Sequence, residues 1–176
     1  MPQILSLSNM HDPVSIANYF VKRSWEQGTE LTPMKLVKLV YISHGWHLGI
    51  TNQPLLTEVP QAWQYGPVVP KVYHTFKRYG NKQVTELYSD VTSAGPLIPT
   101  VNDPSISLLL NKVWDIYSRY SGVELSAITH QPDTPWDIVW NQQGGKYRQG
   151  AIIPNDIIAA HYKKVINGLR ANESIV

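Results

Sequence analysis

One segment, from Thr32 to about Ile50, constrains the fold most, because it predicts a helix that is apolar on most sides. Thr32-Pro33 is a typical helix start, in which threonine caps the first turn and proline occupies it. The polar side of this helix is narrow and is marked by Lys35 and Lys38. A helix of this kind is stable only when other elements cover it, so we expect it to be the central helix. Its apolar positions are Leu36, Val37, Leu39, Val40, Tyr41, Ile42 and Trp46.

Start and stop signals predict further helices around this one. Asp12-Pro13 opens the first of them and Gly28 ends it. The later openings are at Pro67 with Pro70, and then at Pro104, Ser121, Thr134-Pro135 and Pro154. The chain is therefore expected to be mainly α, a single-domain bundle of about six or seven helices around a buried central helix. We expect the domain to span residues 12–170, with flexible tails at 1–11 and 171–176.

Two stretches predict extended structure instead of helix. Val59 to Tyr65 is expected to be a short extended segment, and Pro60 would confine it to a sheet edge because proline cannot donate a ladder hydrogen bond. Gln83 to Thr100 is weakly patterned and contains Gly95-Pro96, which predicts a strand-like excursion and a loop. These stretches leave room for a small β-hairpin.

The composition argues against several functional classes. The 176 residues include no cysteine, so the chain forms no disulfide, thiolate zinc site or cysteine nucleophile. A net charge of +2 is much milder than that of a dedicated nucleic-acid binder. No stretch approaches the roughly 18 apolar residues of a membrane span, and the N-terminus lacks the pattern of a signal peptide. We expect a cytoplasmic protein that acts without a membrane.

Histidines are the strongest candidates for chemistry, and each has a more ordinary explanation. His44 and His47 are three residues apart on the central helix, which could place two imidazoles on one metal. No third ligand accompanies them, so packed or hydrogen-bonded histidines are favoured. His130 lies near Asp133, as a base and its orienting group would, but no nucleophile completes the arrangement. A structural histidine at a helix end is favoured there.

Other catalytic signals are also weak. The glycines at 144, 145 and 150 with Lys146 do not have the order of a phosphate-binding loop. The acidic residues form no local pair suited to acid–base catalysis. We predict no catalytic residue, no cofactor and no metal, and an enzyme with an unrecognised site is the remote alternative.

The helix after Pro70 carries the clearest candidate for a contact surface. Lys71, His74, Lys77 and Arg78 form a basic face, which is either an ordinary solvated face or an electrostatic docking surface for an acidic partner. We expect the opposite side, with Val72, Phe76 and Tyr79, to enter the core. The preceding turn presents an aromatic side chain beside this face. The hypothesis is that a protein partner touches Tyr65, Gly66, Pro67, Lys71, His74 and Arg78.

Three separated blocks of sequence carry a recognisable signature. The first is Leu36-x-Lys38-Leu39-x-Tyr41 with Gly45-Trp46, and the second runs from Ala62-Trp63-x-Tyr65-Gly66-Pro67 to Val72-Tyr73. The third is Glu124-Leu125-Ser126-x-x-Thr129-His130, followed by Pro135-Trp136. In order and spacing these blocks resemble the SocA-like antitoxins, the Panacea domain family, once catalogued as a phage-associated domain of unknown function.

Most of this signature has a reason in the fold itself. Gly45 lets another element approach the central helix closely. Tyr65-Gly66-Pro67 makes a sharp turn that glycine and proline fill comfortably. Trp136, at a helix start, can plug the open end of the bundle. The signature therefore cannot be equated with a binding site.

The resemblance implies the antitoxin of a type II toxin–antitoxin pair, which neutralises a co-encoded protein toxin by direct binding. Toxins of unrelated chemistry are paired with this domain, so the toxin is not specified. One relative delivers its toxin to an AAA+ protease, which makes a proteolytic adaptor the alternative. Some relatives carry an added N-terminal helix-turn-helix. A domain that starts near Asp12 leaves no room for one, so no specific nucleic acid is expected as a partner.

Overall fold

The computed structural model describes residues 9–173, and residues 1–8 and 174–176 lie outside the described range. Its helices are α1 (Pro13–Gln27), α2 (Pro33–Thr51), α3 (Pro70–Phe76), α4 (Pro104–Tyr117), α5 (Gly122–Thr129), α6 (Pro135–Asp137) and α7 (Asn155–Glu173). Shorter helical turns are η2 (Lys77–Tyr79), η3 (Ile138–Gln142) and η4 (Gly145–Tyr147). The strands are β1 (Gln61–Trp63), β2 (Gly66–Val68), β3 (Asp90–Thr92), β4 (Gly95–Leu97) and β5 (Ala151–Ile152). The predicted mainly α, single-domain fold is confirmed.

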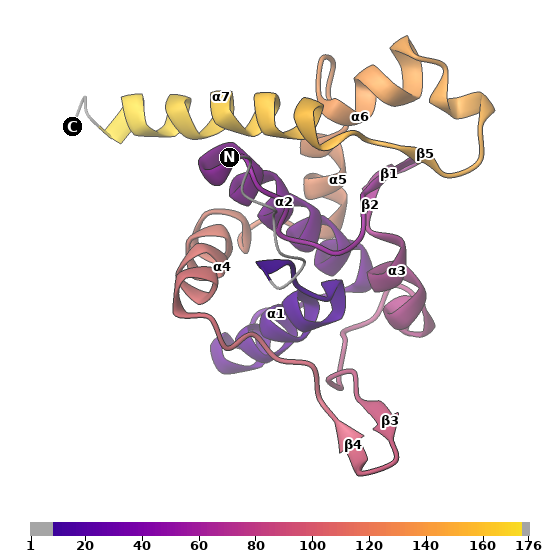
Figure 1. Ribbon diagram of the computed structural model, residues 1–176, viewed down its shortest axis with the longest axis vertical. Helices are drawn as coiled ribbons and strands as arrows, with labels where there is room; N and C mark the ends of the chain where they lie inside the picture. The colour runs from indigo at the N-terminus through magenta and orange to yellow at the C-terminus, as the bar shows by residue number, and fades with distance from the viewer. Residues whose placement is uncertain (1–8, 174–176) are drawn as a thin grey trace, which may run out of the picture.

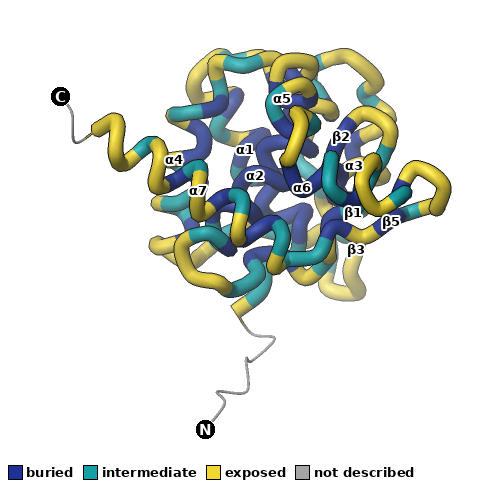
Figure 2. Tube along the Cα trace, turned by 90° about the horizontal axis from the view of Figure 1, so that it is seen from above, coloured by how far each residue is buried: buried dark blue, intermediate teal, exposed yellow. Residues whose placement is uncertain are grey.

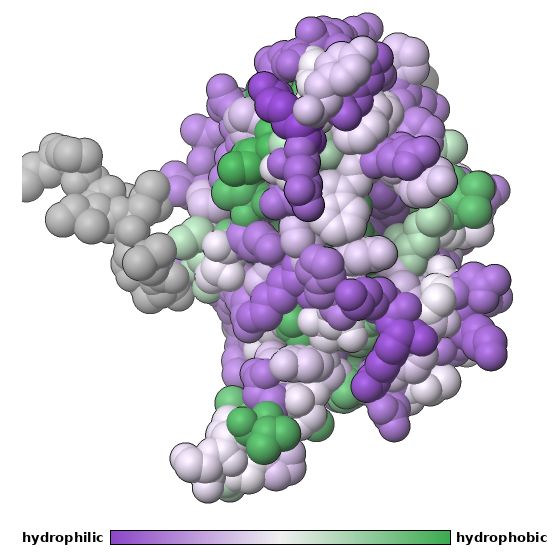
Figure 3. All heavy atoms as spheres, turned by 90° about the vertical axis from the view of Figure 1, so that its right-hand side faces the viewer, coloured by the Kyte–Doolittle hydropathy of each residue, from purple (hydrophilic) through white to green (hydrophobic). Residues whose placement is uncertain are grey.

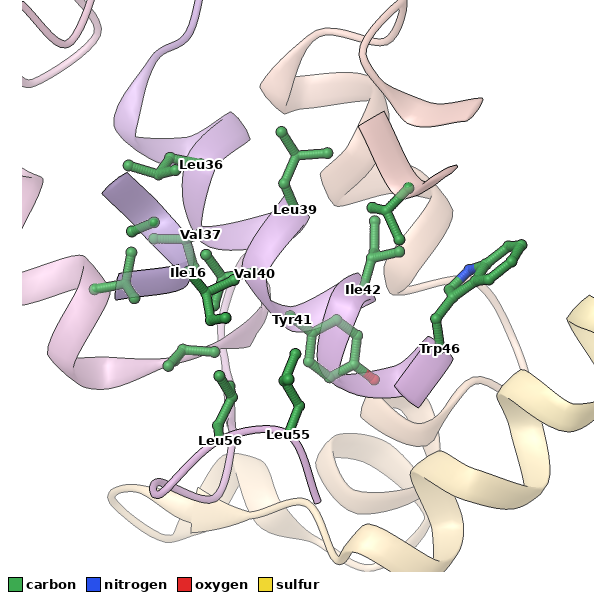
Figure 4. Close-up of a cluster of buried hydrophobic side chains, with 14 of the residues drawn as sticks. Ile16, Leu36, Val37, Leu39, Val40, Tyr41, Ile42, Trp46, Leu55 and Leu56 are labelled. Carbon is green, nitrogen blue, oxygen red and sulfur yellow. The ribbon is translucent and has the colours of Figure 1, made fainter. Parts of the chain in front are cut away.

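Helix α2 lies at the centre, and α1, α4, α5 and α7 pack around it (Figures 1 and 2). Its apolar side chains leave the helix in several directions, and Figure 4 shows Leu36, Leu39 and Tyr41 pointing to different sides. All three are buried. The helix begins as predicted, because the Thr32 hydroxyl accepts a hydrogen bond from the backbone N–H of Lys35. The expectation of a buried central helix is confirmed.

The expected polar side of α2 is wrong, because Lys35 and Lys38 are both buried. The ammonium of Lys35 donates to the carbonyl of Ser118 at 2.5 Å, and the ammonium of Lys38 donates to carbonyls of the β1–β2 hairpin. A lysine can bury its aliphatic stem against apolar neighbours while its head finds polar partners. Here those partners are backbone carbonyls of other elements, which a helical pattern does not reveal.

Helix α7 packs along α2 through two glycines of α2 (Figure 1). A Cβ atom added to Gly45 would lie 2.3 Å from the ring of Tyr162. One added to Gly49 would lie 3.0 Å from the backbone nitrogen of Lys163. The missing side chains allow the two helices to meet at close range, and the aromatic ring of Tyr162 fills the space. The expected close approach at Gly45 is confirmed.

A three-stranded antiparallel sheet, in the order β2-β1-β5, lies beside α3 and α5. The expectation that Pro60 confines its segment to a sheet edge is wrong, because β1 is the middle strand. Pro60 precedes β1, and its carbonyl accepts a hydrogen bond from the N–H of Ile153 at 2.9 Å. Pro67 does not begin a helix either, since it pairs with Ala62 inside β2. Pro70 alone takes the first position of α3.

The second hairpin, β3–β4, projects from the body of the protein (Figure 1). Gly95-Pro96 lies within β4, in keeping with the expected strand-like excursion. The hairpin carries Val91, which is 95% exposed, and Leu97, which is also exposed. An apolar patch is visible on it at the lower end of Figure 3. This hairpin contributes little to the core.

The remaining helix ends follow their local signals. Asp12 caps α1, Gly28 ends it in the left-handed conformation, and Ser121 with Glu124 forms the predicted capping box of α5. His11 exchanges backbone hydrogen bonds with Leu55 and Thr57, and α7 continues to Glu173. The domain bounds and flexible tails stay a prediction, and residues 1–8 and 174–176 of these tails lie outside the described range. Across residues 9–173, no helix is long and apolar enough to cross a membrane.

Candidate protein-interaction site

The tip of the β1–β2 hairpin consists of Gln64 and Tyr65, which lie between the paired residues Trp63 and Gly66. Gly66 has φ of 111°, in the region that favours glycine. A Cβ atom there would also lie 2.7 Å from the Lys38 ammonium nitrogen. Glycine is therefore needed both for the turn and for the space beneath it. The turn leaves the side chain of Tyr65 67% exposed.

Buried donors from three other elements hold the carbonyls of this tip. The indole N–H of Trp136 donates to the carbonyl of Trp63 at 2.6 Å. The hydroxyl of Ser126 donates to the carbonyl of Tyr65, also at 2.6 Å. Lys38 donates to the carbonyls of Tyr65 and Pro67, at 3.1 and 2.8 Å. Four hydrogen bonds thus fix a short turn that ends in an exposed aromatic side chain.

Lys38 is the least ordinary of these donors, because it is a cation with only 2% of its surface exposed. Among the described residues no carboxylate forms an ion pair with it. Burial disfavours the charged form and lowers the pKa of Lys38 from its usual 10.5 to about 7. Its hydrogen bonds to the hairpin are the compensation that the structure shows for removing the ammonium from water.

A cluster of aromatic rings lies next to the hairpin. Trp136, at the start of α6, is buried and stacks on Trp140 with ring centroids 5.7 Å apart. The ring of His130 lies 5.2 Å from that of Trp136, and its Nδ1 is 3.4 Å from the hydroxyl of Ser126. The three blocks of the sequence signature therefore converge on one hairpin, which the sequence did not reveal.

Two grooves flank the hairpin tip, and Trp63 and Gln64 line both. One groove, of about 460 Å³, lies between the tip, the first half of α2 and α3. The other, of about 600 Å³, lies between β1, α3 and the loop after η4. Figure 3 looks onto this side of the molecule, where strongly hydrophilic side chains surround paler and apolar ones. The tip is thus a ridge between two hollows, a shape that a protein partner can enclose.

The basic row on α3 and η2 is exposed as predicted, but most of its charge is paired. Lys71 forms an ion pair with Asp12 at 2.8 Å, and Arg78 forms one with Glu86 at 3.1 Å. Neither cation lines the two grooves. The opposite face is in the core at Val72 and Phe76, as expected. Tyr79 is only partly buried, and the Arg78 guanidinium lies 5.0 Å from its ring.

The structure therefore divides the six predicted contact residues into three groups. Gly66 and Pro67 are buried, so they shape the turn and do not present a surface. Tyr65 is exposed at the tip, and His74 is exposed beside it, with its ring 6.1 Å from that of Trp63. Lys71 and Arg78 lie outside the grooves. No contact of the described residues joins these two cations to Tyr65.

Several residues of the site were missed. Lys38, Ser126 and Trp136 hold the tip, while Met34 and Tyr73 line the smaller groove. Lys77, which was expected in the basic face but not among the contact residues, lines it too. The sequence held one signal for the residues that hold the tip, because Lys38, Ser126 and Trp136 each belong to a block of the signature. It did not indicate that the blocks meet in space.

The candidate catalytic histidines are hydrogen-bonded, as favoured from the sequence. His44 Nε2 lies 2.9 Å from the amide oxygen of Asn155, and His47 Nδ1 lies 2.6 Å from the carbonyl of Gln53. Burial lowers the pKa of both rings. His130 is the C-cap of α5, in keeping with a structural histidine at a helix end. Across residues 9–173 no three potential metal ligands cluster.

The fold and the site define a mainly helical domain with a β-hairpin that buried side chains hold by hydrogen bonds. The chain belongs to the family of SocA-like antitoxins with a Panacea domain, which it matches over residues 36–137. That range begins in α2 and ends with α6, so it contains the hairpin and all three side chains that hold it.

The resemblance extends to a whole protein. The chain is 26% identical over 166 residues to the antitoxin SocA of Caulobacter vibrioides (strain NA1000 / CB15N). The alignment covers 93% of this chain and 88% of that protein. No solved structure matches significantly.

Proposed function

We propose that this chain is a cytoplasmic antitoxin of a type II pair, which neutralises a co-encoded protein toxin by direct binding. Membership of the SocA-like family supports the proposal, as does the similarity to a protein named as an antitoxin. Both point to a protein partner. Neither specifies the chemistry of the toxin, so the proposal concerns the binding role alone.

We place the contact at the hairpin-tip surface, defined as the exposed or partly exposed residues Met34, Trp63, Tyr65, Tyr73, His74 and Lys77. The observation that carries this choice is the exposed Tyr65 on a turn held by four hydrogen bonds. A large side chain presented by a rigid turn loses little conformational entropy on binding. Aromatic anchors of this kind often dominate the energy of a protein interface. Lys71 and Arg78 then lie at its periphery.

Co-expression with each neighbouring reading frame tests the role. A neighbour that is toxic alone should become harmless when this chain is present. The variant Tyr65→Ala should fold like the wild type, because the side chain is exposed, and should bind the toxin at least tenfold more weakly, which is about 1.4 kcal/mol. Leu108→Ala is the matched control, since Leu108 is similarly exposed but lies on α4.

The outcomes separate the role from the surface. If this chain relieves the toxicity of no neighbouring gene product, the antitoxin role is contradicted. Full neutralisation by Tyr65→Ala would move the contact elsewhere. The half-life of the toxin distinguishes direct blocking from delivery to an AAA+ protease. A blocker leaves the toxin long-lived in a complex, whereas an adaptor shortens its life only when the protease is present.

A further inference from the structure

The smaller groove beside the hairpin tip has walls that are mostly apolar. We call it the Met34 groove. It is about 460 Å³, which is within the usual size of a binding pocket. Met34 and Tyr73 are 39% and 38% exposed, and Tyr65 is more exposed still. Single exposed apolar side chains are ordinary, but three around one hollow form a patch that favours an apolar occupant. The full lining is Pro33, Met34, Val37, Lys38, Trp63, Gln64, Tyr65, Val68, Tyr73, Lys77 and Gly80.

The charges of the Met34 groove all have one sign. Lys38 and Lys77 line it, and no aspartate or glutamate does. Among the described residues neither lysine has an ion pair. An ammonium carries three N–H donors, and Lys38 uses two on the carbonyls of Tyr65 and Pro67. A buried cation normally has a partner of opposite charge. The charge of the groove lining is therefore positive only, and the buried ammonium of Lys38 has no counter-charge among the described residues.

We propose that the Met34 groove receives a segment of a protein partner in which an apolar side chain is flanked by a carboxylate. The apolar side chain lies between Met34 and Tyr73, and the carboxylate is drawn to the ammonium groups of Lys38 and Lys77. Charge complementarity decides this occupant, because a neutral or basic segment would leave both lysines without a counter-charge. The inference rests on the proposed function only where it takes the partner to be a toxin.

The lowered pKa of Lys38 agrees with this geometry. Burial is the cause of the shift, and no carboxylate offsets it. An acidic group bound in the groove would supply the missing favourable interaction with the charged form. The same carboxylate would approach Lys77, which is exposed and therefore adds less.

Small probes test the groove without the toxin. The full chain is labelled with ¹³C in its methionine methyl groups and titrated with indole-3-propionate or with its neutral amide, indole-3-propionamide. We expect the signal of Met34 to shift and saturate with the acid, and the amide to bind about three- to fivefold more weakly. The signal of Met10, which lines a different hollow, should not move.

Variants locate the charge effect. Lys77→Gln should fold normally, since its side chain is exposed, and should weaken binding of the acid while leaving the amide unchanged. Lys164→Gln, an exposed lysine on α7, is the charge-matched control and should change neither. Lys38→Met should also weaken binding of the acid. If that variant does not fold, Lys77→Gln still decides the question.

Three results would overturn the inference: no saturable shift of Met34, equal affinity for acid and amide, or loss of acid binding in Lys164→Gln as large as that in Lys77→Gln. The result is independent of the toxin assay. If the charge-dependent binding is found and no neighbouring gene product is neutralised, the groove inference is supported and the antitoxin role is contradicted. If neutralisation occurs and the probes show no charge preference, the antitoxin role stands and the groove inference falls.

Discussion

Lys38 links the core to the hairpin tip through one side chain. It starts from the central helix, is buried, and ends on two carbonyls of the β1–β2 hairpin. The charged form of a buried lysine is costly even when it is hydrogen-bonded. A shorter or apolar residue would avoid that cost, but it would remove the donor to the carbonyl of Pro67 and leave the carbonyl of Tyr65 to Ser126 alone. Burial of Lys38 therefore lowers the stability of the fold, while its hydrogen bonds fix the hairpin turn.

The cost of Lys38 predicts how stability depends on pH. Its folded-state pKa of about 7 lies below the unfolded value of 10.5, so the unfolded chain binds more protons between these values. Stability therefore rises with pH in this window, by up to about 1.4 kcal/mol per pH unit. Denaturant unfolding of wild type and Lys38→Met from pH 6 to 9 isolates the effect. The difference should grow in favour of the wild type above pH 7. A difference as flat as that for Lys164→Met would contradict the prediction.

His44 predicts a pH dependence of the same sign in the acid range. Burial lowers its pKa from 6.5 to about 4. The N–H of Leu56 donates to Nδ1, so the proton is on Nε2, which donates to Asn155. Between pH 6.5 and 4 the unfolded chain binds a proton that the folded chain does not. Stability should therefore fall by about 3 kcal/mol as the pH drops through this range.

Nuclear magnetic resonance of ¹⁵N-labelled histidine checks the state of His44 directly. The ring should remain neutral and protonated on Nε2 at pH 5.5 in the folded chain. The variant His44→Gln should lose the acid-dependent part of the destabilisation. Protonation of His44 above pH 6 in the folded chain would show that the ring is less buried than the structure indicates.

At the scale of elements, the contact between α2 and α7 gives a sharp test of packing. Gly45→Ala places a methyl group 2.3 Å from the ring of Tyr162. Tyr162 is buried, so it cannot move without disturbing the core. We expect a loss of about 2–3 kcal/mol in the free energy of unfolding, measured with denaturant.

The matched control lies on the partner helix. Gly168 of α7 has open space where its Cβ would be. Gly168→Ala should stabilise the protein by about 0.5–1 kcal/mol, because alanine favours the helix more than glycine. Equal effects of the two alanines would mean that helix propensity, and not contact with Tyr162, governs these positions.

The elements were largely predictable because their signals are local. Asp12, Thr32 and Ser121 cap helices as expected, since a cap depends on residues within one turn. Pro60 and Lys38 were misread because their roles depend on distant segments. Pro60 precedes a strand that gains a neighbour on both sides, one of them β5 from the far end of the chain. Local sequence cannot specify such a neighbour.

The site was predictable only in parts, for the same reason. The turn at Tyr65 and the outward row on α3 follow from local patterns, and both are exposed as expected at Tyr65, Lys71 and His74. Their arrangement does not follow, because it depends on how α3 sits against the hairpin. Ion pairing of Lys71 with Asp12, 59 residues away, is another long-range result. The sequence therefore predicted the candidate parts of the surface but not which of them lie together.

At the scale of the molecule, the burial pattern separates a single core from a projecting arm. The core centres on α2 (Figure 2), whereas β3–β4 extends beyond the other elements (Figure 1). The root of the arm is held by Asn18, a buried residue of α1. Its amide donates to the carbonyls of Tyr88 and Pro99, both at 3.0 Å, and accepts from the N–H of Tyr88 at 2.9 Å. The outer end and the root of the β3–β4 arm should therefore contribute differently to the free energy of unfolding.

This difference predicts that the arm can be shortened without loss of the fold. Replacing residues 91–96 with Asn-Gly keeps the paired residues Asp90 and Leu97 and closes them with a favourable two-residue turn. Because Val91 and its neighbours are exposed, the free energy of unfolding should change by less than about 1 kcal/mol. Asn18→Ala, with the arm intact, should cost about 2–3 kcal/mol, since it leaves three partly buried backbone groups without their hydrogen bonds. Chemical unfolding of both variants measures these changes in the free energy of unfolding. A large loss on shortening, or none in Asn18→Ala, would show that the arm and not its root is part of the cooperative core.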